Sequence, residues 1–325
     1  MNRDFLNSKT NNTENISPEQ LDSEEREMNK LIDEYIQHPD CKSYIENFKT
    51  IKPICEEVLK QRHPEIKEKE WSKNISINDA IKYAHQFLTT IDSTLADQFM
   101  NLVYQNNNNQ KTLNILPNYI KPYCEKGKAY INYHDKIENM ITLLHEMVHA
   151  MGYSDAMNTN SAYRYLSESP TLIIENLFSK WLVKNKVITQ NDYNLLKEWR
   201  LRDSQDVASK TLMEIALIDM RKKGKYITKK RVLEMIDEKQ HINNFTTREE
   251  CIKYFLMKVL TKRQLYFKES ERYVIGQYIS DKLDKTRNPE KEFLEIYYLA
   301  SNPNITPEKS LKIIKEKYQE PNIDR

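Results

Sequence analysis

The stretch IENMITLLHEMVHAMG, residues 137–152, decides the fold around it. Its apolar side chains recur at the three- and four-residue spacing of a helix that buries one side. This apolar stripe consists of Ile137, Met140, Ile141, Leu144, Val148 and Met151. Asp135 and Glu138 have the spacing of a capping box at the start of the helix, and Gly152 is a typical end. The sequence therefore predicts one amphipathic helix over 137–152.

Two histidines of this helix have the spacing of metal ligands. His145 and His149 are four residues apart, so both imidazoles can reach one ion from the same helical face. Glu146 is turned away from the pair but can still reach a water bound to that ion. Zinc lowers the pKa of such a water, and a nearby carboxylate can take its proton. The alternative is two polar histidines on an amphipathic helix, but such groups beside a buried stripe are costly without partners. The pattern predicts a zinc site with Glu146 as the base.

A third ligand follows at a suitable distance. Glu168 comes nineteen residues after His149, and Pro170 suits the start of a new helix, which puts Glu168 at the positive end of that helix. Catalytic zinc takes three protein ligands and one open position, and two histidines with a glutamate are a known set. Glu175, two helical turns on, can accept a hydrogen bond from a ligand histidine. The alternatives are a helix-capping acid for Glu168 and a surface carboxylate for Glu175.

Two sequence blocks also resemble a known family. The first block is INY at residues 131–133 with ITLLHEMVHA at 141–150, and the second is ESPTLIIEN at 168–176. They resemble the patterns NY…TLxHExGHA and ExPSxxxEN of the M3 family of zinc metallopeptidases, which includes thimet oligopeptidase and oligoendopeptidase F. The resemblance covers most of the chain, as a shortened member. It implies a mainly α fold, a gluzincin-type catalytic domain, with Glu168 as the third zinc ligand and Glu175 as the carboxylate that supports a ligand histidine.

The chain departs from the family at two places. Val148 stands where the family has glycine, which changes the packing of the helix there. The family also stabilises the oxyanion of the reaction with a histidine and tyrosines near its C-terminus. Tyr273 and Tyr278 can be placed on the tyrosine positions, and Lys268 stands near the position of the missing histidine. Phenol or ammonium donors aimed at a developing oxyanion stabilise it. The alternative is that both tyrosines, among 20 in the chain, serve only packing.

Three regions are predicted along the chain. Residues 1–20 form a polar, disordered tail, residues 21–75 form N-terminal helices, and residues 76–320 form the catalytic domain. The best strand candidate is 128–133, in a segment broken by proline and glycine just before the motif helix. Ser17 to Gln20 and Ser76 are predicted helix starts. Further helices are predicted over 20–37, 42–62, from 76 onward, and over 170–185, 190–200, 205–223, 227–238, 248–263, 270–285, 290–300 and 307–318.

Composition excludes several classes of function. Fifty basic and 48 acidic residues leave a net charge of +2, so nothing draws the whole chain to nucleic acid or an anionic membrane. The four cysteines are scattered without a CxxC pair, which fits a reducing compartment. The polar N-terminus lacks the apolar core of a signal peptide. We therefore expect a cytoplasmic protein, or one exported without a cleavable signal as a bacterial effector would be, whose partner is a peptide or protein substrate.

Three functions are consistent with these patterns. The first is a zinc-dependent peptidase that cleaves peptides. The second is an effector-type protease specific for a particular folded host protein, because the region before the catalytic part is too short to build the deep channel of the family. The third is a non-catalytic zinc-binding module, suggested by Val148 and by the missing histidine.

Overall fold

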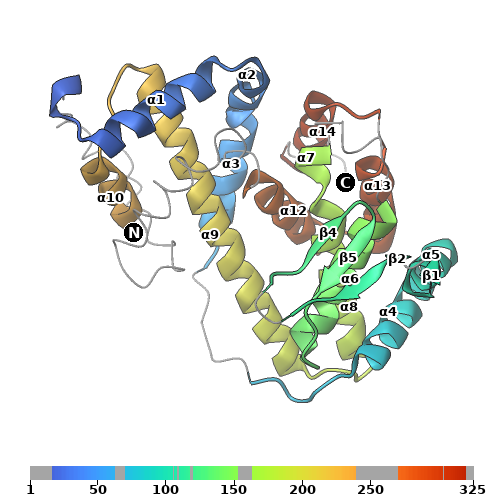
Figure 1. Cartoon of the computed structure of the whole chain (residues 1–325). Coiled ribbons are helices and arrows are strands. Elements are labelled where there is room, and N and C mark those ends of the chain that lie inside the picture. Colours follow the sequence, from blue (N-terminus) through green and yellow to red (C-terminus); the bar gives the residue numbers. More distant parts are fainter. Residues whose placement is uncertain are drawn as a thin grey trace. The chain divides into compact units, whose positions relative to one another are not determined.

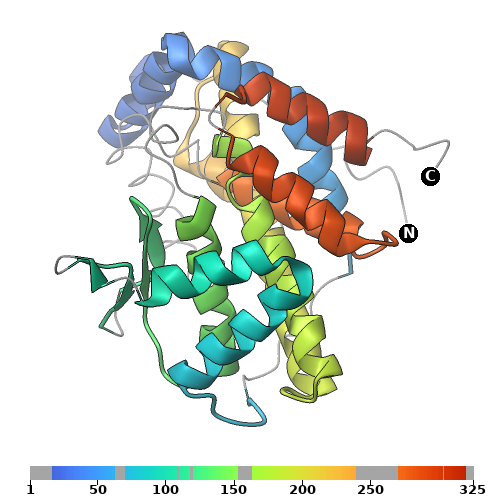
Figure 2. The ribbon, with the colours of Figure 1, turned by 90° about the vertical axis from the view of Figure 1, so that its right-hand side faces the viewer.

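The computed structural model describes most of the 325 residues and is mainly helical, as predicted (Figures 1 and 2). The described ranges are 17–62, 70–104, 106–107, 110–117, 120–152, 163–238, 270–302 and 304–319. Within these ranges no helix combines the length and the apolar character that a membrane span needs.

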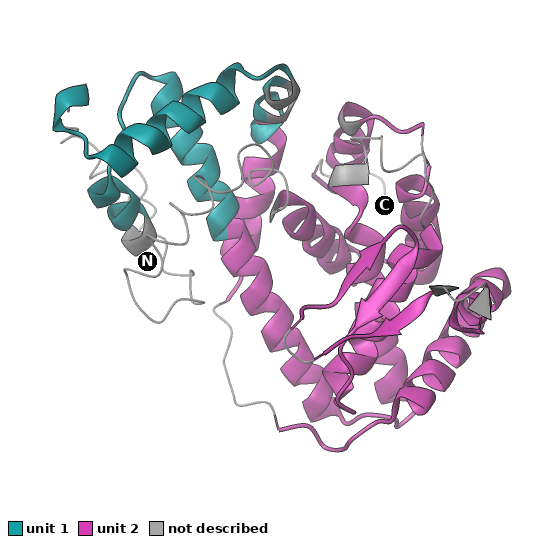
Figure 3. Cartoon of the chain, in the orientation of Figure 1, with its two compact units in different colours: residues 1–48, 209–267 teal, residues 49–208, 268–325 magenta. Residues whose placement is uncertain are grey.

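The chain forms two compact units, each assembled from segments far apart in the sequence (Figure 3). Unit 1 contains residues 1–48 and 209–267, and unit 2 contains residues 49–208 and 268–325. The division follows contacts between distant segments, so its limits differ from the regions expected from composition and motifs.

Unit 1 contains the first helices and a later helical pair. Its described elements are η1 (Pro18–Gln20), α1 (Ser23–Gln37), α2 (Pro39–Glu46), the second part of α9 (Gln190–Lys222) and α10 (Lys229–Glu238). The predicted helix start at Ser17 forms only one 3₁₀ turn, in which Ser17 N donates to Gln20 Oε1 at 2.7 Å. Helix α1 begins later because Asp22 caps it, accepting from Glu25 N at 2.8 Å.

Unit 2 contains the motif helix and the sheet. Its elements are α3 (Phe48–Leu59), α4 (Ile77–Ile91), α5 (Ser93–Tyr104), β1 (Asn106–Asn107), β2 (Gln110–Lys111), β3 (Leu113–Ile115), β4 (Tyr123–Glu125), β5 (Lys128–Ile131), α6 (Ile137–Gly152), α7 (Tyr163–Leu166), α8 (Ser169–Lys184), the first part of α9, α12 (Ser270–Leu283), α13 (Pro289–Ala300), α14 (Pro307–Ile314) and η4 (Lys315–Gln319). Helices α4 and α5 pack on each other and both contact α6 (Figure 2). Helix α8 packs against α6, α12 and α13.

The three-stranded sheet packs against the motif helix α6 through β4 and β5. Its order is β3-β5-β4, with β5 parallel to β3 and antiparallel to β4. Strand β5 confirms the predicted strand, and its buried residues Ala129 and Ile131 lie in a strand that contacts α6. Because β4 is an edge of this sheet and also contacts α6, its side chains can reach the groups on that helix.

Helix α6 has the predicted extent but a different cap. The predicted stripe is buried, and so is most of the rest of the helix. The capping box of Asp135 and Glu138 was wrong. Asp135 takes a left-handed conformation (φ 55°), and Asn139 Oδ1 accepts instead from His134 N at 3.0 Å and Lys136 N at 3.3 Å. The side chain of Asn139 therefore satisfies backbone donors at the helix start.

Most predicted helices exist, but their continuity was harder to predict. Ser76 caps α4 as expected, yet the helical run from there is broken at Asp92, whose side chain caps α5. The two helices predicted over 190–200 and 205–223 are one, α9, since no proline or glycine interrupts them. The helix predicted over 42–62 is divided between α2 and α3. The one predicted over 248–263 lies outside the described residues.

Asp192 anchors the segment before α4 to the start of α9. Its fully buried carboxylate accepts from Ser72 N at 2.9 Å, Thr189 N at 2.8 Å and Thr189 Oγ1 at 2.7 Å. Burial alone would raise the pKa of Asp192, but these hydrogen bonds outweigh it and lower the pKa.

We expect Asp192→Asn to destabilise the protein by about 3 kcal/mol, because an amide donor then faces buried donors. Urea unfolding at neutral pH measures this loss. A carboxyl with a lowered folded pKa stabilises above its unfolded pKa of about 4 and loses this effect as pH falls through the folded value. The difference between the two proteins should persist down to about pH 5 and narrow only in stronger acid. Exposed Asp97→Asn is the control, and equal losses in both variants would contradict the anchoring role.

Candidate metal centre

The two motif histidines project from one face of α6. Their ring centroids are 4.9 Å apart and the rings meet at 75°. Both side chains are largely buried, with 12% of His145 and 11% of His149 exposed. The apolar side of the helix is held by the sheet and α8, so the imidazoles have little freedom to turn away. The helix therefore presents two nitrogen ligands in a fixed arrangement.

Glu168 joins this pair from the start of α8. It is the residue that precedes the first turn of α8, as the Glu168-Ser169-Pro170 sequence predicted, although proline occupies the second helical position. Glu168 Oε2 lies 3.3 Å from His149 Nε2 and 3.4 Å from His145 Nε2. The structure thus brings together the three residues that the sequence singled out as ligands.

The spacing of these three atoms fits a small tetrahedral cation. Ligands about 2.0 to 2.1 Å from a tetrahedral zinc ion lie roughly 3.3 Å from one another. The two measured nitrogen–oxygen distances have this length, and one ligand atom from each residue lies within 4.8 Å of the others. In the described part of the chain, no fourth His, Cys, Asp or Glu joins the group. Two histidines and one carboxylate with an open position are a donor set that zinc accepts.

The charges of the group also favour a cation. Burial alone would raise the pKa of Glu168, but the charge of His149 and hydrogen bonds with His145 and His149 hold it well below its usual value. Burial alone would lower the pKa of His145, but hydrogen bonds to Glu168 and Glu175 hold it well above its usual value. A carboxylate this buried stays ionised only beside positive charge, which a proton on an imidazole or a metal ion can supply.

A chain of hydrogen bonds fixes the orientation of His145. Its Nδ1 lies 2.7 Å from Glu175 Oε1, as the predicted supporting role requires. Arg200, on α9, donates from Nε to Glu175 Oε2 at 3.1 Å and from Nη2 to Ser179 Oγ at 3.0 Å. With Nδ1 donating to Glu175, Nε2 is the nitrogen that would bind a metal once its proton is displaced.

We expect Glu175→Gln to weaken zinc binding about 10- to 100-fold, because one amide cannot accept from both His145 and Arg200. Competition with a chromophoric chelator measures the affinity. Glu290→Gln, an exposed glutamate on α13, is the control. If both variants bound zinc like the wild type, the orienting role of Glu175 would be excluded.

Glu146 lies beside the three ligands and is not a member of the group. It is 7% exposed, and burial raises its pKa. The raised pKa means that its carboxylate accepts a proton more readily than an exposed glutamate does. This combination of place and basicity is what a general base needs.

The two predicted oxyanion donors separate in the structure. The charge of Glu168 first, then burial, and to a lesser extent the charge of Glu146 raise the pKa of Tyr273. Tyr278 is buried, and its hydroxyl donates to Tyr318 O at 2.9 Å. Positions five apart in a helix point about 140° away from each other, so α12 cannot present both tyrosines to one site. The hydroxyl of Tyr278 is thus occupied by a backbone carbonyl, and its role as an oxyanion donor stays a prediction. Lys268 lies outside the described residues.

Three residues of the site were missed in the sequence. Arg200 holds Glu175, Arg272 Nε lies 3.4 Å from Glu168 Oε1, and Cys124 lies on the edge strand β4. Burial raises the pKa of Cys124 to about 12, and the charges of Glu146 and Glu168 contribute. Only the position of Arg272, next to Tyr273, offered a signal. The other two reach the site from elements that only the fold brings there.

Gly276 allows α12 to contact the backbone of Glu168. A Cβ atom at this position would lie 2.9 Å from Glu168 O and 2.9 Å from Leu172 Cδ1. The backbone oxygen cannot give way as a flexible side chain can. The close packing of α12 on α8 thus determines where the Glu168 carboxylate lies.

We expect Gly276→Ala to cost about 1 to 3 kcal/mol of stability and to weaken zinc binding by displacing Glu168. Urea unfolding and a zinc titration measure the two effects. Gly224→Ala is the control, since Gly224 has a φ of 74° and no atom within 4 Å of an added Cβ. It should lose stability through backbone strain and keep its zinc affinity. Unchanged zinc affinity in Gly276→Ala would show that this packing does not position the ligand.

Comparisons with known proteins were made at three levels. No protein-family model, curated protein or solved structure matches the chain. Val148, the residue that stands for the glycine of the M3 pattern, is 2% exposed on the packed side of α6. Its side chain therefore fills core space.

Proposed function

We propose that the protein is a zinc-dependent peptidase with a gluzincin-type catalytic domain, similar to the M3 family. The observation that carries the proposal is that Glu168 Oε2 lies 3.3 Å from His149 Nε2 and 3.4 Å from His145 Nε2, the separation expected of ligand atoms around a tetrahedral zinc ion. Glu146, next to His145 in the sequence, has its basicity raised by burial and would act as the base. The three ligand residues and the base thus belong to one site.

Each residue has a defined task in peptide hydrolysis. Zinc, when bound, acidifies water and polarises the scissile carbonyl. Glu146 takes the proton of the attacking water and then passes it to the leaving nitrogen, so one carboxylate serves both steps. Glu175 and Arg200 keep His145 in the tautomer that donates from Nδ1. The Tyr273 phenol, whose pKa the charges of Glu168 and Glu146 raise, would donate to the oxyanion.

A zinc-binding module without catalysis is less well supported. A structural zinc ion takes four protein ligands, whereas the described residues bring together three. Such a module would also not require a buried carboxylate next to the ligands. The effector-type protease shares the chemistry of the proposal and differs only in its substrate.

The test combines metal analysis with an assay on quenched-fluorescent peptides. The purified full-length protein should carry one zinc ion, cleave members of the library, lose the activity with a chelator and regain it with added zinc. Cleavage of one protein in a cell lysate, without cleavage of the peptides, would instead identify a protease for a folded substrate. Stoichiometric zinc with no cleavage in either assay would overturn the proposal in favour of the non-catalytic module.

A further inference from the structure

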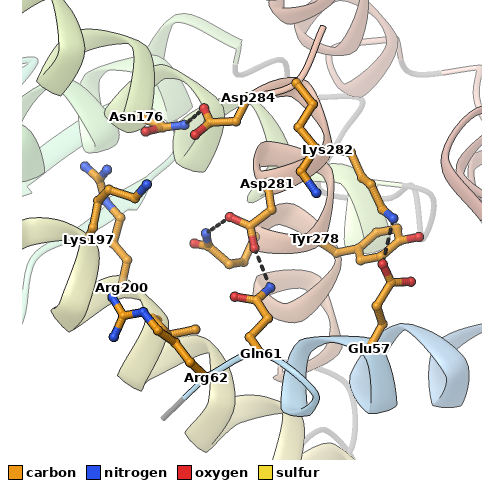
Figure 4. Close-up of a pocket in the computed structure, with 13 residues that line it drawn as sticks. Glu57, Gln61, Arg62, Asn176, Lys197, Arg200, Tyr278, Asp281, Lys282 and Asp284 are labelled. Atoms are coloured by element: carbon orange, nitrogen blue, oxygen red, sulfur yellow. Dashed lines mark hydrogen bonds and ion pairs between the residues drawn. The ribbon is translucent and has the colours of Figure 1, made fainter. Parts of the chain in front are cut away.

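A cavity in unit 2 is lined in part by Arg200 (Figure 4), which also donates to Glu175, the carboxylate that holds His145. Its volume is about 380 Å³, which is within the range of small-molecule sites. The end of α3, α8, α9 and α12 contribute its walls. Charged side chains dominate the lining, with five cationic residues and three carboxylates. Such a lining favours a charged ligand over an apolar one.

The carboxylates of this cavity are already bound. Asp281 accepts from Gln61 Nε2 at 2.9 Å and from Gln277 Nε2 at 2.8 Å. Glu57 accepts from Lys282 Nζ at 2.6 Å. Asp284 accepts from Lys180 Nζ at 2.8 Å and also from the amide of Asn176 (Figure 4). The negative charges of the lining therefore have donors, and little remains to attract a cation.

The cavity has cationic hydrogen-bond donors that are not used by its carboxylates. Among the described residues, the ammonium groups of Lys197 and Lys285 have no carboxylate at ion-pair distance. Arg200 uses Nε and Nη2 for Glu175 and Ser179, which leaves Nη1 available. Lys197 Nζ lies 5.6 Å from the centroid of the Tyr193 ring, and a carboxylate or phosphate could accept from these groups without breaking an existing ion pair. The balance of donors and acceptors thus selects an anion.

We propose that this cavity is a binding site for a small multivalent anion, a phosphate or a dicarboxylate, held by Lys197, Lys285 and Arg200. The proposal does not depend on peptidase activity. It links the cavity to the metal centre because Arg200 belongs to both: its charge is shared between Glu175 and the bound anion. Removing the charge of Glu175 should therefore change the anion affinity of Arg200.

Calorimetric titration of the full-length protein tests the site, with inorganic phosphate in one arm and succinate in the other. The stronger of the two identifies the ligand chemistry. Lys197→Gln and Lys285→Gln should each weaken binding roughly 10-fold or more, as expected for a lost charge-assisted hydrogen bond. Lys184→Gln, an exposed lysine of α8 outside the cavity, should bind like the wild type.

Two further variants separate this site from the metal centre. His149→Gln removes a metal ligand and should leave anion binding intact. Glu175→Gln removes the competing negative charge next to Arg200 and should tighten it. Absence of binding at millimolar concentrations of either probe, or equal binding in wild type and both cavity lysine variants, would overturn the proposal. So would loss of binding in His149→Gln, because the anion would then occupy the metal centre.

Discussion

Glu146→Gln is expected to lower the rate of peptide hydrolysis by at least about 10² to 10⁴-fold while zinc stays bound. Glutamine has the shape of glutamate but cannot take a proton from water at neutral pH. Glu146 lies outside the group of three ligand atoms, so the substitution removes no metal donor. The variant therefore separates metal binding from catalysis, which no ligand variant can do.

The measurement pairs zinc content with initial rates on a cleaved peptide. Glu125→Gln, an exposed acid on the neighbouring strand β4, is a matched control and should keep full activity. Mapping of cleavage sites in a cell lysate, with wild type compared with Glu146→Gln, then shows which proteins are substrates. Unchanged turnover in Glu146→Gln would reject this residue as the base.

Glu168→Gln is expected to weaken zinc binding by more than about 100-fold, and activity should fall with it. Loss of a group that merely supports a ligand costs about 10- to 100-fold, so loss of an anionic ligand should cost more. The carboxylate lies between the two imidazoles at ligand spacing, and the neutral amide cannot balance the charge of the ion. Arg272, 3.4 Å from Glu168 Oε1, would lose its charge partner there as well.

Chelator competition measures the affinity, and melting curves with and without added zinc provide a second test. Zinc should raise the melting temperature of the wild type and have little effect on Glu168→Gln. His134→Gln is a control, because this exposed histidine lies close to α6 in sequence but outside the ligand group. Wild-type zinc affinity in Glu168→Gln would remove the third ligand from the assignment.

The local sequence predicted most helices correctly. It predicted less well where these helices begin and end and which of them are continuous. The extent of α6 followed from its apolar periodicity and from Gly152. Its cap did not, because Asn139 reaches back to the backbone before the helix and takes the place expected for Asp135 and Glu138. Capping depends on side-chain rotamers, and several polar residues near a helix start compete for the same donors. Spacing alone cannot decide among them.

The candidate site divides in the same way. The pairing of His145 with His149, and the position of Glu146 relative to them on the helix, follow from helical geometry. Because this geometry is local, it can be predicted from the sequence. The order of the motifs predicted that Glu168 joins the two histidines. The distance between Glu168 and His149 depends on how α8 packs against α6, which only the structure shows. The positions of Arg200 and Cys124 near the site, and the hydrogen bond of Tyr278 to Tyr318 O, were decided by tertiary structure alone. Such contacts join residues far apart in the chain, and they depend on which faces of helices and strands pack together, which local periodicity does not specify.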